Sequence, residues 1–307
     1  MAHQAPIGGI GPKTTCLRHF LGGVLKPPIQ ESKEWRRVEK WRKGAGHAQS
    51  TIQVVGAAQA AASKNGRVVK VKSKGGRPET AMALILDALF YRLRNCSPWR
   101  DLPVEKFGPW QTIYGWYRKL AGQGLWQRLL KTIVKEKQRG DVVLVDGTHI
   151  LVHQSAANPR GGAALQAMGK TRGGRNTKLM ALTDRRGRLI NFKLIEGQAY
   201  EGKHVLSLLP RGRRWTVVGD KGFDSDKLRH ALEARGYWHC IPGKCNRRTK
   251  LRYNKKLYRR RYRVENFFCR IKRWACLAMR RDKLAVHFSS LLAFAAIIDW
   301  LQPRSWF

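Results

Sequence analysis

Beyond residue 140, short apolar runs of the kind that form strands alternate with helical patterns up to the end of the 307-residue chain. Val142 to Val145 is a continuous apolar and β-branched run, and Trp215 to Gly219 is a second, largely apolar one. Runs of this length without polar alternation are typical of strands buried on both faces. Strands that alternate with helices favour an α/β fold in which helices pack on a sheet.

The other elements of this region follow from turn residues and periodicity. Asp184 to Gly187 separates two strand-like runs and predicts a hairpin. In chain order, we expect strands at 142–145, 177–183, 189–196, 215–219 and 237–241, and helices at 204–209, 225–235, 258–279 and 285–301.

Residues 75–139 predict a small helical domain. The pattern changes at Arg77 and Pro78, after which apolar residues recur at helical spacing up to Leu93. Two further helices are expected at 110–120 and 125–137. Their basic flanks favour a helix-turn-helix-like DNA-binding domain; the alternative is a helical cap or dimerisation unit with an aromatic core.

Residues 1–74 carry 14 Lys and Arg against three acids, and they show no sustained apolar period. This composition predicts a poorly ordered basic arm. The expected organisation is therefore an arm at 1–74, a helical domain at 75–139 and an α/β domain at 140–307.

The charge of the chain narrows the choice of partner. It has 61 Lys and Arg against 20 Asp and Glu, a formal net charge of +41. A field of this sign favours a polyanion, with nucleic acid as the first candidate and an anionic membrane surface as the second. The 43% of hydrophobic residues can build a core, which excludes a wholly disordered basic protein.

The longest apolar segment is Ala285 to Leu301, which has 17 residues and includes His287 and Asp299. A membrane-spanning helix needs about 20 apolar residues, so we expect a buried helix here. The N-terminus lacks the charged-then-apolar order of a signal peptide. We therefore expect a cytoplasmic protein without a membrane partner.

Asp146 and Asp220 each end a strand that should be buried, in a chain that is poor in acids. Burying a carboxylate costs free energy unless it is paired or holds a metal ion. Taken singly, either aspartate could cap a strand end or pair with one of the many arginines.

A third acid, Glu265, favours the metal-binding interpretation of the two aspartates. On a helical wheel, four polar residues share an arc of about 60°: Tyr258, Arg261, Glu265 and Lys272. The arc lies beside the apolar stripe that should face the core, so Glu265 is expected at the rim, within reach of the strand ends.

Three carboxylates from two strand ends and a helix can hold hard divalent cations. Two ions about 3.5–4 Å apart support in-line displacement at a phosphodiester. We expect two Mg²⁺ ions, which Mn²⁺ could replace, on Asp146, Asp220 and Glu265. Arg261 and Lys272 would contact backbone phosphates, and Tyr258 would stack on a sugar or base.

The spacing Tyr258-x2-Arg261-x3-Glu265-x6-Lys272 resembles the Y-R-E-K signature of bacterial insertion-sequence transposases with an Asp-Asp-Glu site. These enzymes form the superfamily of insertion-sequence families four and five. The run from Val217 to Ser225 is similar to the second-Asp motif of that family, an apolar strand followed by Asp-Lys-Gly-aromatic-Asp-Ser.

Two other segments carry the same resemblance. Val145 to His149 resembles the first-Asp motif, with Gly147 where a Ser is common. Three upstream motifs resemble the N-terminal helical domain of the family-five branch: Gly76 to Pro78, Ser97 to Pro103 and Phe107 to Trp110. The resemblance adds Lys221 and Arg77 to the candidate nucleic-acid-binding residues.

The resemblance implies an RNase H-like domain, with a mixed five-stranded sheet flanked by helices. Asp146 would lie on the first strand, Asp220 after the fourth and Glu265 on a later helix. Some relatives carry a large β insertion before that helix, whereas residues 242–257 leave room only for a short loop. Trp238 is a candidate for the aromatic that stacks on a flipped base in relatives; the alternative is a packed strand residue.

The resemblance also implies transposition. Water would attack the phosphodiester at the end of the element, and the freed 3′-hydroxyl would then attack target DNA. Residues 75–139 would recognise terminal inverted repeats, and joining two ends predicts at least a homodimer on double-stranded DNA, at the nucleoid. Two alternatives stay open: an RNase H-like nuclease that cuts without joining, and an inactive DNA-binding protein.

Overall fold

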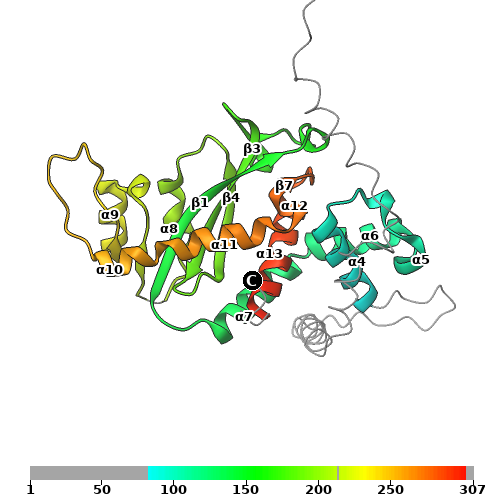
Figure 1. Cartoon of the computed structure of the whole chain (residues 1–307), viewed down its shortest axis with the longest axis horizontal. Helices are drawn as coiled ribbons and strands as arrows, with labels where there is room; N and C mark the ends of the chain where they lie inside the picture. The colour runs from blue at the N-terminus through cyan, green and yellow to red at the C-terminus, as the bar shows by residue number, and fades with distance from the viewer. Residues whose placement is uncertain (1–81, 213, 302–307) are drawn as a thin grey trace, which may run out of the picture. The chain divides into compact units, whose positions relative to one another are not determined.

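The computed structural model describes residues 82–212 and 214–301. These residues belong to one compact unit, drawn in colour in Figure 1. The predicted basic arm at 1–74 and the candidate residue Arg77 lie outside the described residues.

A seven-stranded mixed sheet forms the centre of the described region. Five strands lie in the order β4-β3-β1-β5-β6, with these bounds: β1 (Val142–Val152), β3 (Gly174–Asp184), β4 (Leu189–Glu196), β5 (Thr216–Val218) and β6 (Trp238–Cys240). Strand β3 is antiparallel to β1 and β4, whereas β1, β5 and β6 are parallel. This arrangement confirms the mixed five-stranded sheet of the predicted RNase H-like fold.

Two short strands that the sequence did not predict extend this sheet. They are β2 (Gly169–Thr171), which pairs with β3, and β7 (Met279–Arg280), which pairs with β1. Single-turn helices occupy several connections: η1 (Trp99–Asp101), η2 (Gln154–Ala156), η3 (Ala164–Gln166), η4 (Glu201–His204), η5 (Lys221–Phe223) and η6 (Arg259–Arg261).

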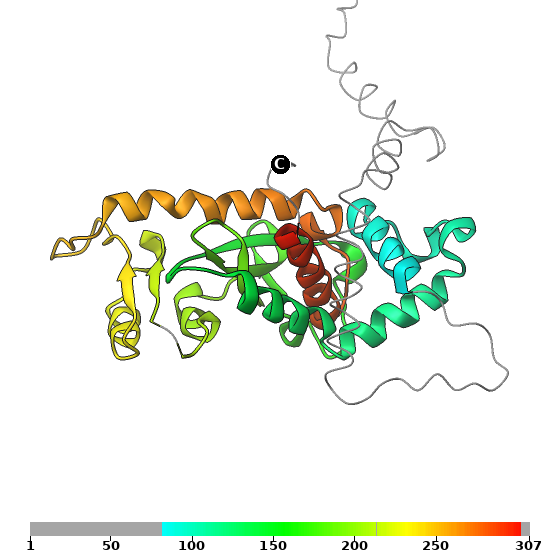
Figure 2. The same ribbon diagram turned by 90° about the horizontal axis from the view of Figure 1, so that it is seen from below.

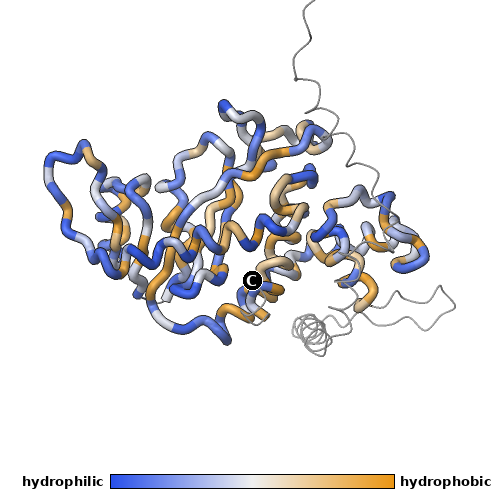
Figure 3. Tube along the Cα trace, in the orientation of Figure 1, coloured by the Kyte–Doolittle hydropathy of each residue, from blue (hydrophilic) through white to orange (hydrophobic). Residues whose placement is uncertain are grey.

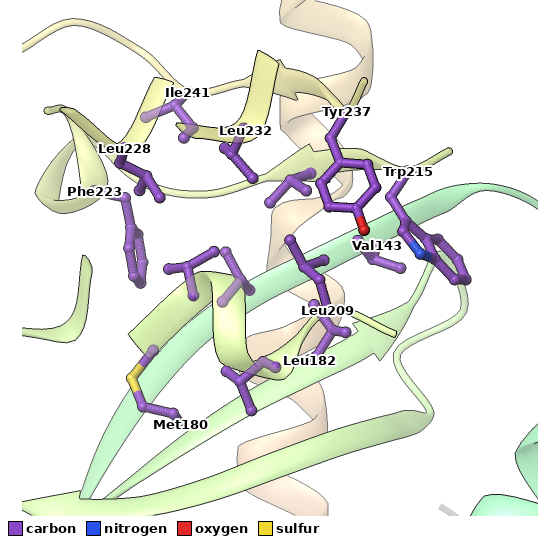
Figure 4. Close-up of a cluster of buried hydrophobic side chains, with 14 of the residues drawn as sticks. Val143, Met180, Leu182, Leu209, Trp215, Phe223, Leu228, Leu232, Tyr237 and Ile241 are labelled. Carbon is purple, nitrogen blue, oxygen red and sulfur yellow. The ribbon is translucent and has the colours of Figure 1, made fainter. Parts of the chain in front are cut away.

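Helices cover both faces of the sheet (Figure 2). On one face, Val143 and Val145 of β1 join a hydrophobic cluster with residues of α8 (Val205–Leu208) and α9 (Asp226–Glu233) (Figure 4). Because side chains alternate along a strand, Asp146 points to the opposite face. That face is covered by α11 (Tyr262–Lys272), whose buried stripe consists of Val264, Phe267, Phe268 and Ile271.

Strand β1 is longer than the sequence predicted. It was expected to end before Asp146, but it continues to Val152, so Asp146 lies within the strand. Strand β5 pairs with β1 only at Val142 to Leu144, and β7 only at Leu151 and Val152. Among the described residues no strand pairs with this edge of β1 between those two positions, and Asp146 lies in that gap.

The prediction of a single helix at 258–279 is wrong. The structure has α10 (Lys255–Tyr258), then η6, α11 and α12 (Ala275–Ala278). Between α11 and α12, Trp274 is extended, with φ −77° and ψ 113°. Its ring packs edge-on against Phe90, with ring centroids 5.3 Å apart. A contact with a residue far away in the sequence thus accompanies the break in the helix.

Four helices precede the sheet: α4 (Met82–Asn95), α5 (Val104–Phe107), α6 (Trp110–Gly122) and α7 (Leu125–Lys137). Helix α4 packs against α12, and α6 and α7 pack against α13 (Ala285–Leu301), at the other end of the chain. Trp126 meets Phe294 with ring centroids 4.8 Å apart, and the Tyr117 hydroxyl donates to the His287 carbonyl at 2.7 Å. The two ends of the described chain therefore share one core.

Helix α13 is hydrophobic over most of its length and buried in this core, which confirms the prediction of a buried helix (Figure 3). No helix in 82–212 or 214–301 is long and apolar enough to cross a membrane. The packing of α4, α6 and α7 on α12 and α13 supports a helical cap. DNA recognition by these helices, and a domain boundary at residue 139, stay predictions.

We predict that Trp126→Ala lowers the free energy of unfolding by about 3–5 kcal/mol, because it leaves a cavity between α7 and α13. The loss should appear as one shifted transition in urea, followed by circular dichroism and by fluorescence. Trp116→Ala is the matched control, since Trp116 is only partly buried and lies against Lys119. A variant in which the helices unfold separately from the sheet would contradict the shared core.

Candidate active site

Asp146 is a partly buried acid on the face of β1 that α11 covers. Its side chain is only 16% exposed. One carboxylate oxygen accepts the N–H of Gly147 at 2.9 Å, and the other accepts from Arg261 at 2.8 Å. Burial raises the pKa of Asp146 to about 6, and the negative charges of Asp220 and Glu201 add to this rise, while the two donors oppose it.

Asp220 follows β5 and caps η5, where its side chain accepts the N–H of Gly222 at 2.8 Å. The parallel register pairs Leu144 with Val218. Asp146 and Asp220 each follow this pair by two residues, and the charge of Asp220 acts on the Asp146 carboxylate. The repulsion between these charges contributes to the raised pKa of Asp146.

Arg261 joins Glu265 to this pair. One end of its guanidinium donates to Asp146, and the other donates to Glu265 one helical turn later. The Glu265 side chain is 50% exposed, which agrees with the predicted place at the rim of the helix. The guanidinium therefore lies between the two carboxylates and offsets part of their charge.

Lys272, at the other end of α11, also reaches β1. Its ammonium donates to Thr148 Oγ1 at 2.7 Å and to the His149 carbonyl at 3.1 Å. Burial lowers the pKa of Lys272. Thr148 follows Asp146 by two residues and so points to the same face. The predicted arc of Arg261, Glu265 and Lys272 is thus the side of α11 that faces the open edge of β1.

The remaining predicted residues lie further out. Tyr258, on α10, packs edge-on against Tyr253 with ring centroids 5.4 Å apart. Lys221 is exposed and directly follows Asp220. Trp238 is 73% exposed on β6, so the expectation of a packed residue is wrong. It pairs with Thr216 at the end of β5 remote from Asp220, which separates it from the acids.

Sequence reasoning missed Glu201, which begins η4. Its carboxylate pairs with the buried Lys178, with Oε1 and Nζ 3.2 Å apart. A Cβ placed on Gly147 would lie 2.7 Å from Cδ of Glu201. The Glu201 carboxylate therefore fills the space that a side chain at position 147 would need. The glycine in place of a common serine was the sequence signal of this contact.

Tyr200, next to Glu201, was also missed. Its side chain is 45% exposed. Burial raises the pKa of its hydroxyl, and the nearby charges of Asp224, Glu201 and Asp220 raise it further. The connection between β4 and α8 thus places an aromatic ring and a fourth carboxylate beside the two aspartates.

Carboxylates are the ligands that hard divalent cations prefer, and Asp146 and Asp220 supply two neighbouring ones. Within 82–212 and 214–301, no three His, Cys, Asp or Glu side chains surround a common cation position. Arg261 occupies the space between Asp146 and Glu265. The two aspartates are thus of the right chemical kind for a divalent cation, whereas Glu265 is paired with Arg261.

Two family models match this chain. "Transposase DDE domain" matches residues 137–298, which is more than half of the chain. The chain belongs to the transposase DDE domain family. "Putative transposase of IS4/5 family" matches residues 67–130, in the helical region. The chain is thus a DDE transposase of the IS4/IS5 type, from a class of DNA-cleaving enzymes that use divalent metal ions.

A curated relative is the uncharacterized protein y4sN of Sinorhizobium fredii, 33% identical over 89 residues, or 29% of this chain and 70% of that protein. Two solved structures are similar in part. The piggyBac transposase synaptic complex with hairpin DNA matches 76% of this chain and 69% of its own, at 11% identity and a TM-score of 0.45. The Mos1 strand transfer complex matches 94% of this chain and 89% of its own, at 14% identity and a TM-score of 0.29. The family models, and not these structures, carry the assignment.

We predict that Asp146→Asn stabilises this transposase at neutral pH. A pKa raised from 3.8 to about 6 means that the ionised carboxylate costs stability above pH 6, and that this cost disappears as the pH falls toward 4. The variant should gain about 2–3 kcal/mol at pH 7.5, and the gain should shrink between pH 6 and pH 4. The measurement is urea unfolding without divalent metal.

Asp226→Asn is the matched control for charge, because the Asp226 side chain is 66% exposed. It should leave the pH profile unchanged. A loss of stability in Asp146→Asn at pH 7.5, or a gain that does not depend on pH, would contradict the buried, charged state of Asp146.

We also predict that Gly147→Ala destabilises the protein by about 1–3 kcal/mol, since the new methyl must displace Glu201 from Lys178. The cost should fall when Glu201→Ala is present, as a double-mutant cycle in thermal unfolding would show. Gly115→Ala is the control, because a Cβ there meets open space on α6. Additive effects at positions 147 and 201 would argue against the contact.

Proposed function

We propose that this transposase binds the terminal inverted repeats of an insertion sequence and joins the cut ends to target DNA. Water attacks the phosphodiester at the end of the element and releases a 3′-hydroxyl. That hydroxyl then attacks a target phosphodiester and displaces the 3′-oxygen of the target strand. The supporting observation is the contact of Arg261 with Asp146 and Glu265, beside Asp220, in a chain of charge +41.

Asp146, Asp220 and Glu265 would hold two Mg²⁺ ions, for which Mn²⁺ could substitute. When bound there, the ions would activate the attacking oxygen and stabilise the departing one. Burial is the main cause of the raised pKa of Asp146, and repulsion from Asp220 adds to it, so a cation bound between the two carboxylates would relieve that repulsion.

The basic residues of the Y-R-E-K motif would position the strand. Arg261 would exchange Glu265 for a backbone phosphate, since a guanidinium binds either anion through paired N–H groups. Lys272, held against β1 by Thr148 and His149, would contact the next phosphate. Tyr258 would stack on a sugar or base, and Lys221 would contact the backbone beside Asp220.

Residues 75–139, including Arg77, would read the inverted repeats. Two ends must be held together for joining, so we expect at least a homodimer on double-stranded DNA. The charge of +41 would keep the protein on the DNA of the nucleoid through sequence-independent phosphate contacts. A nuclease that cuts without joining is the rival, and joined products in a strand-transfer assay would exclude it.

We predict that Asp220→Asn abolishes cleavage and preserves DNA binding. The amide oxygen can still accept the N–H of Gly222, so η5 should stay in place, while a charged ligand is removed. The substrate is a duplex that carries the inverted repeat found beside the gene. Cleavage is measured with Mg²⁺, and binding by gel shift in EDTA.

Asp226→Asn removes an equal charge from the exposed start of α9 and should leave both properties intact. Cleavage by Asp220→Asn at the wild-type rate would overturn the assignment. Absence of cleavage by the wild-type protein, with binding retained, would favour the inactive DNA-binding alternative.

A further inference from the structure

The turn between β3 and β4 is unusually well fixed. Asp184, only 1% exposed, accepts the N–H groups of Arg186 and Arg188 at 2.8 and 2.9 Å. Its second oxygen accepts from the Arg188 guanidinium at 2.9 and 2.7 Å. Gly187 has a φ of 75°, and a Cβ there would lie 2.5 Å from the Arg263 carbonyl. Position 187 therefore requires glycine.

Helices α11 and α13 hold the same turn from outside. Arg270 donates to the Gly187 carbonyl at 2.6 Å and to both oxygens of Asp299 at 2.8 and 3.0 Å. Arg263 donates to the Arg185 carbonyl at 3.1 Å. The turn and the two helices thus form a fixed frame that carries several arginines.

Two cavities adjoin this turn, and Arg186 lines both. One, of about 200 Å³, lies between the turn and α11 and is lined by Arg186, Tyr262, Arg263, Asn266 and Arg270. The other, of about 160 Å³, lies toward the end of α7 and is lined by Lys137, Arg139, Gly140, Arg185, Arg186 and Arg188. We call the pair the turn cradle.

The charge of the turn cradle is strongly positive. Asp184 pairs with Arg188, and Asp299 pairs with Arg270. Within the described ranges no carboxylate pairs with Arg185 or Arg263. The buried Nε of Arg263 also meets no acceptor there. Guanidinium groups held in this way, together with the Asn266 amide and the Tyr262 hydroxyl, are suited to a phosphate.

The cradle lies on the flank of α11 away from the three acids. On a helical wheel with Tyr262 at 0°, the cradle residues Asn266, Arg270 and Arg263 fall between about 40° and 100°. Glu265 and Lys272 fall near 280–300°. Asp184 pairs with Val143, three residues before Asp146, which is about 10 Å along β1. The cradle is therefore separate from the catalytic acids, yet within a few nucleotides of them.

We propose that the turn cradle binds successive backbone phosphates of a DNA strand that crosses α11 on its way to Asp146. This inference rests on the proposed function and adds to it a contact surface outside the Y-R-E-K motif. Two adjoining cationic cavities that share Arg186 match a polyanion with regularly spaced charges better than a single free anion. The strand can belong to the element end or to the target.

The test is duplex binding in EDTA as a function of salt, which is independent of catalysis. Removing one phosphate-binding side chain should reduce the slope of log K against log salt by about 0.9. We expect the double variant Arg185→Gln/Arg186→Gln to reduce the slope by about 1–2 and to weaken binding about tenfold at moderate salt. The pair Arg185→Lys/Arg186→Lys should keep most of the slope.

Lys227→Gln/Arg235→Gln is the matched control, since it removes two exposed charges at α9, away from the turn. An equal fall in slope in this control, or none in the cradle variant, overturns the proposal. Asn266→Asp is a second variant, for the case in which the double variant does not fold. It places a carboxylate among arginines, so it should also weaken DNA binding about tenfold. Unchanged binding by a folded Asn266→Asp overturns the proposal as well.

Two assays identify the strand. If the cradle holds the element end, the cradle variant loses end cleavage; if it holds target DNA, cleavage persists and joining falls. Either result supports the cradle, and equal cleavage and joining by variant and wild type overturn it. A failure of the proposed function would appear in a different measurement. Cleavage by Asp220→Asn tests the catalytic role of the acids, whereas the salt dependence of DNA binding tests the cradle without any cleavage.

Discussion

The structure around β1 depends on one electrostatic constraint: a buried carboxylate beside a second carboxylate requires a positive charge nearby. Asp146 is in this position, and its neighbour Asp220 caps η5. Arg261 supplies the charge, and in doing so it fixes the start of α11 over the open edge of β1. Glu265 shares the same guanidinium, so one side chain sets the distance of the third acid from the other two.

Much of this arrangement could be predicted from the sequence. The apolar runs before Asp146 and Asp220 give parallel neighbouring strands, and helical spacing alone puts Arg261, Glu265 and Lys272 on one side. The mixed five-stranded sheet came from the family resemblance, and the order of strands and helices agreed with it. These features are local, because they depend on periodicity within a few residues and on the rule that parallel strands end at one edge of a sheet.

The predictions that were wrong concern features that depend on contacts between residues far apart in the sequence. The sequence did not predict that β1 continues past Asp146, because the strand is held there by β3 and by the two-residue strand β7. The helix break at Trp274 coincides with packing on Phe90, which no window around Trp274 contains. Glu201 meets Gly147 in the fold although 54 residues separate them in the sequence. Each miss is a case in which tertiary packing overrides a regular local pattern.

The shared core of α4, α6 and α7 with α12 and α13 has a consequence for how the protein is made. The first described helices leave the ribosome long before their packing partners, which are the last ones. Until synthesis is nearly complete, surfaces such as Trp126 lack the residues that will cover them. A chain that stops before α12 therefore lacks the residues that cover α4, α6 and α7 in the complete structure.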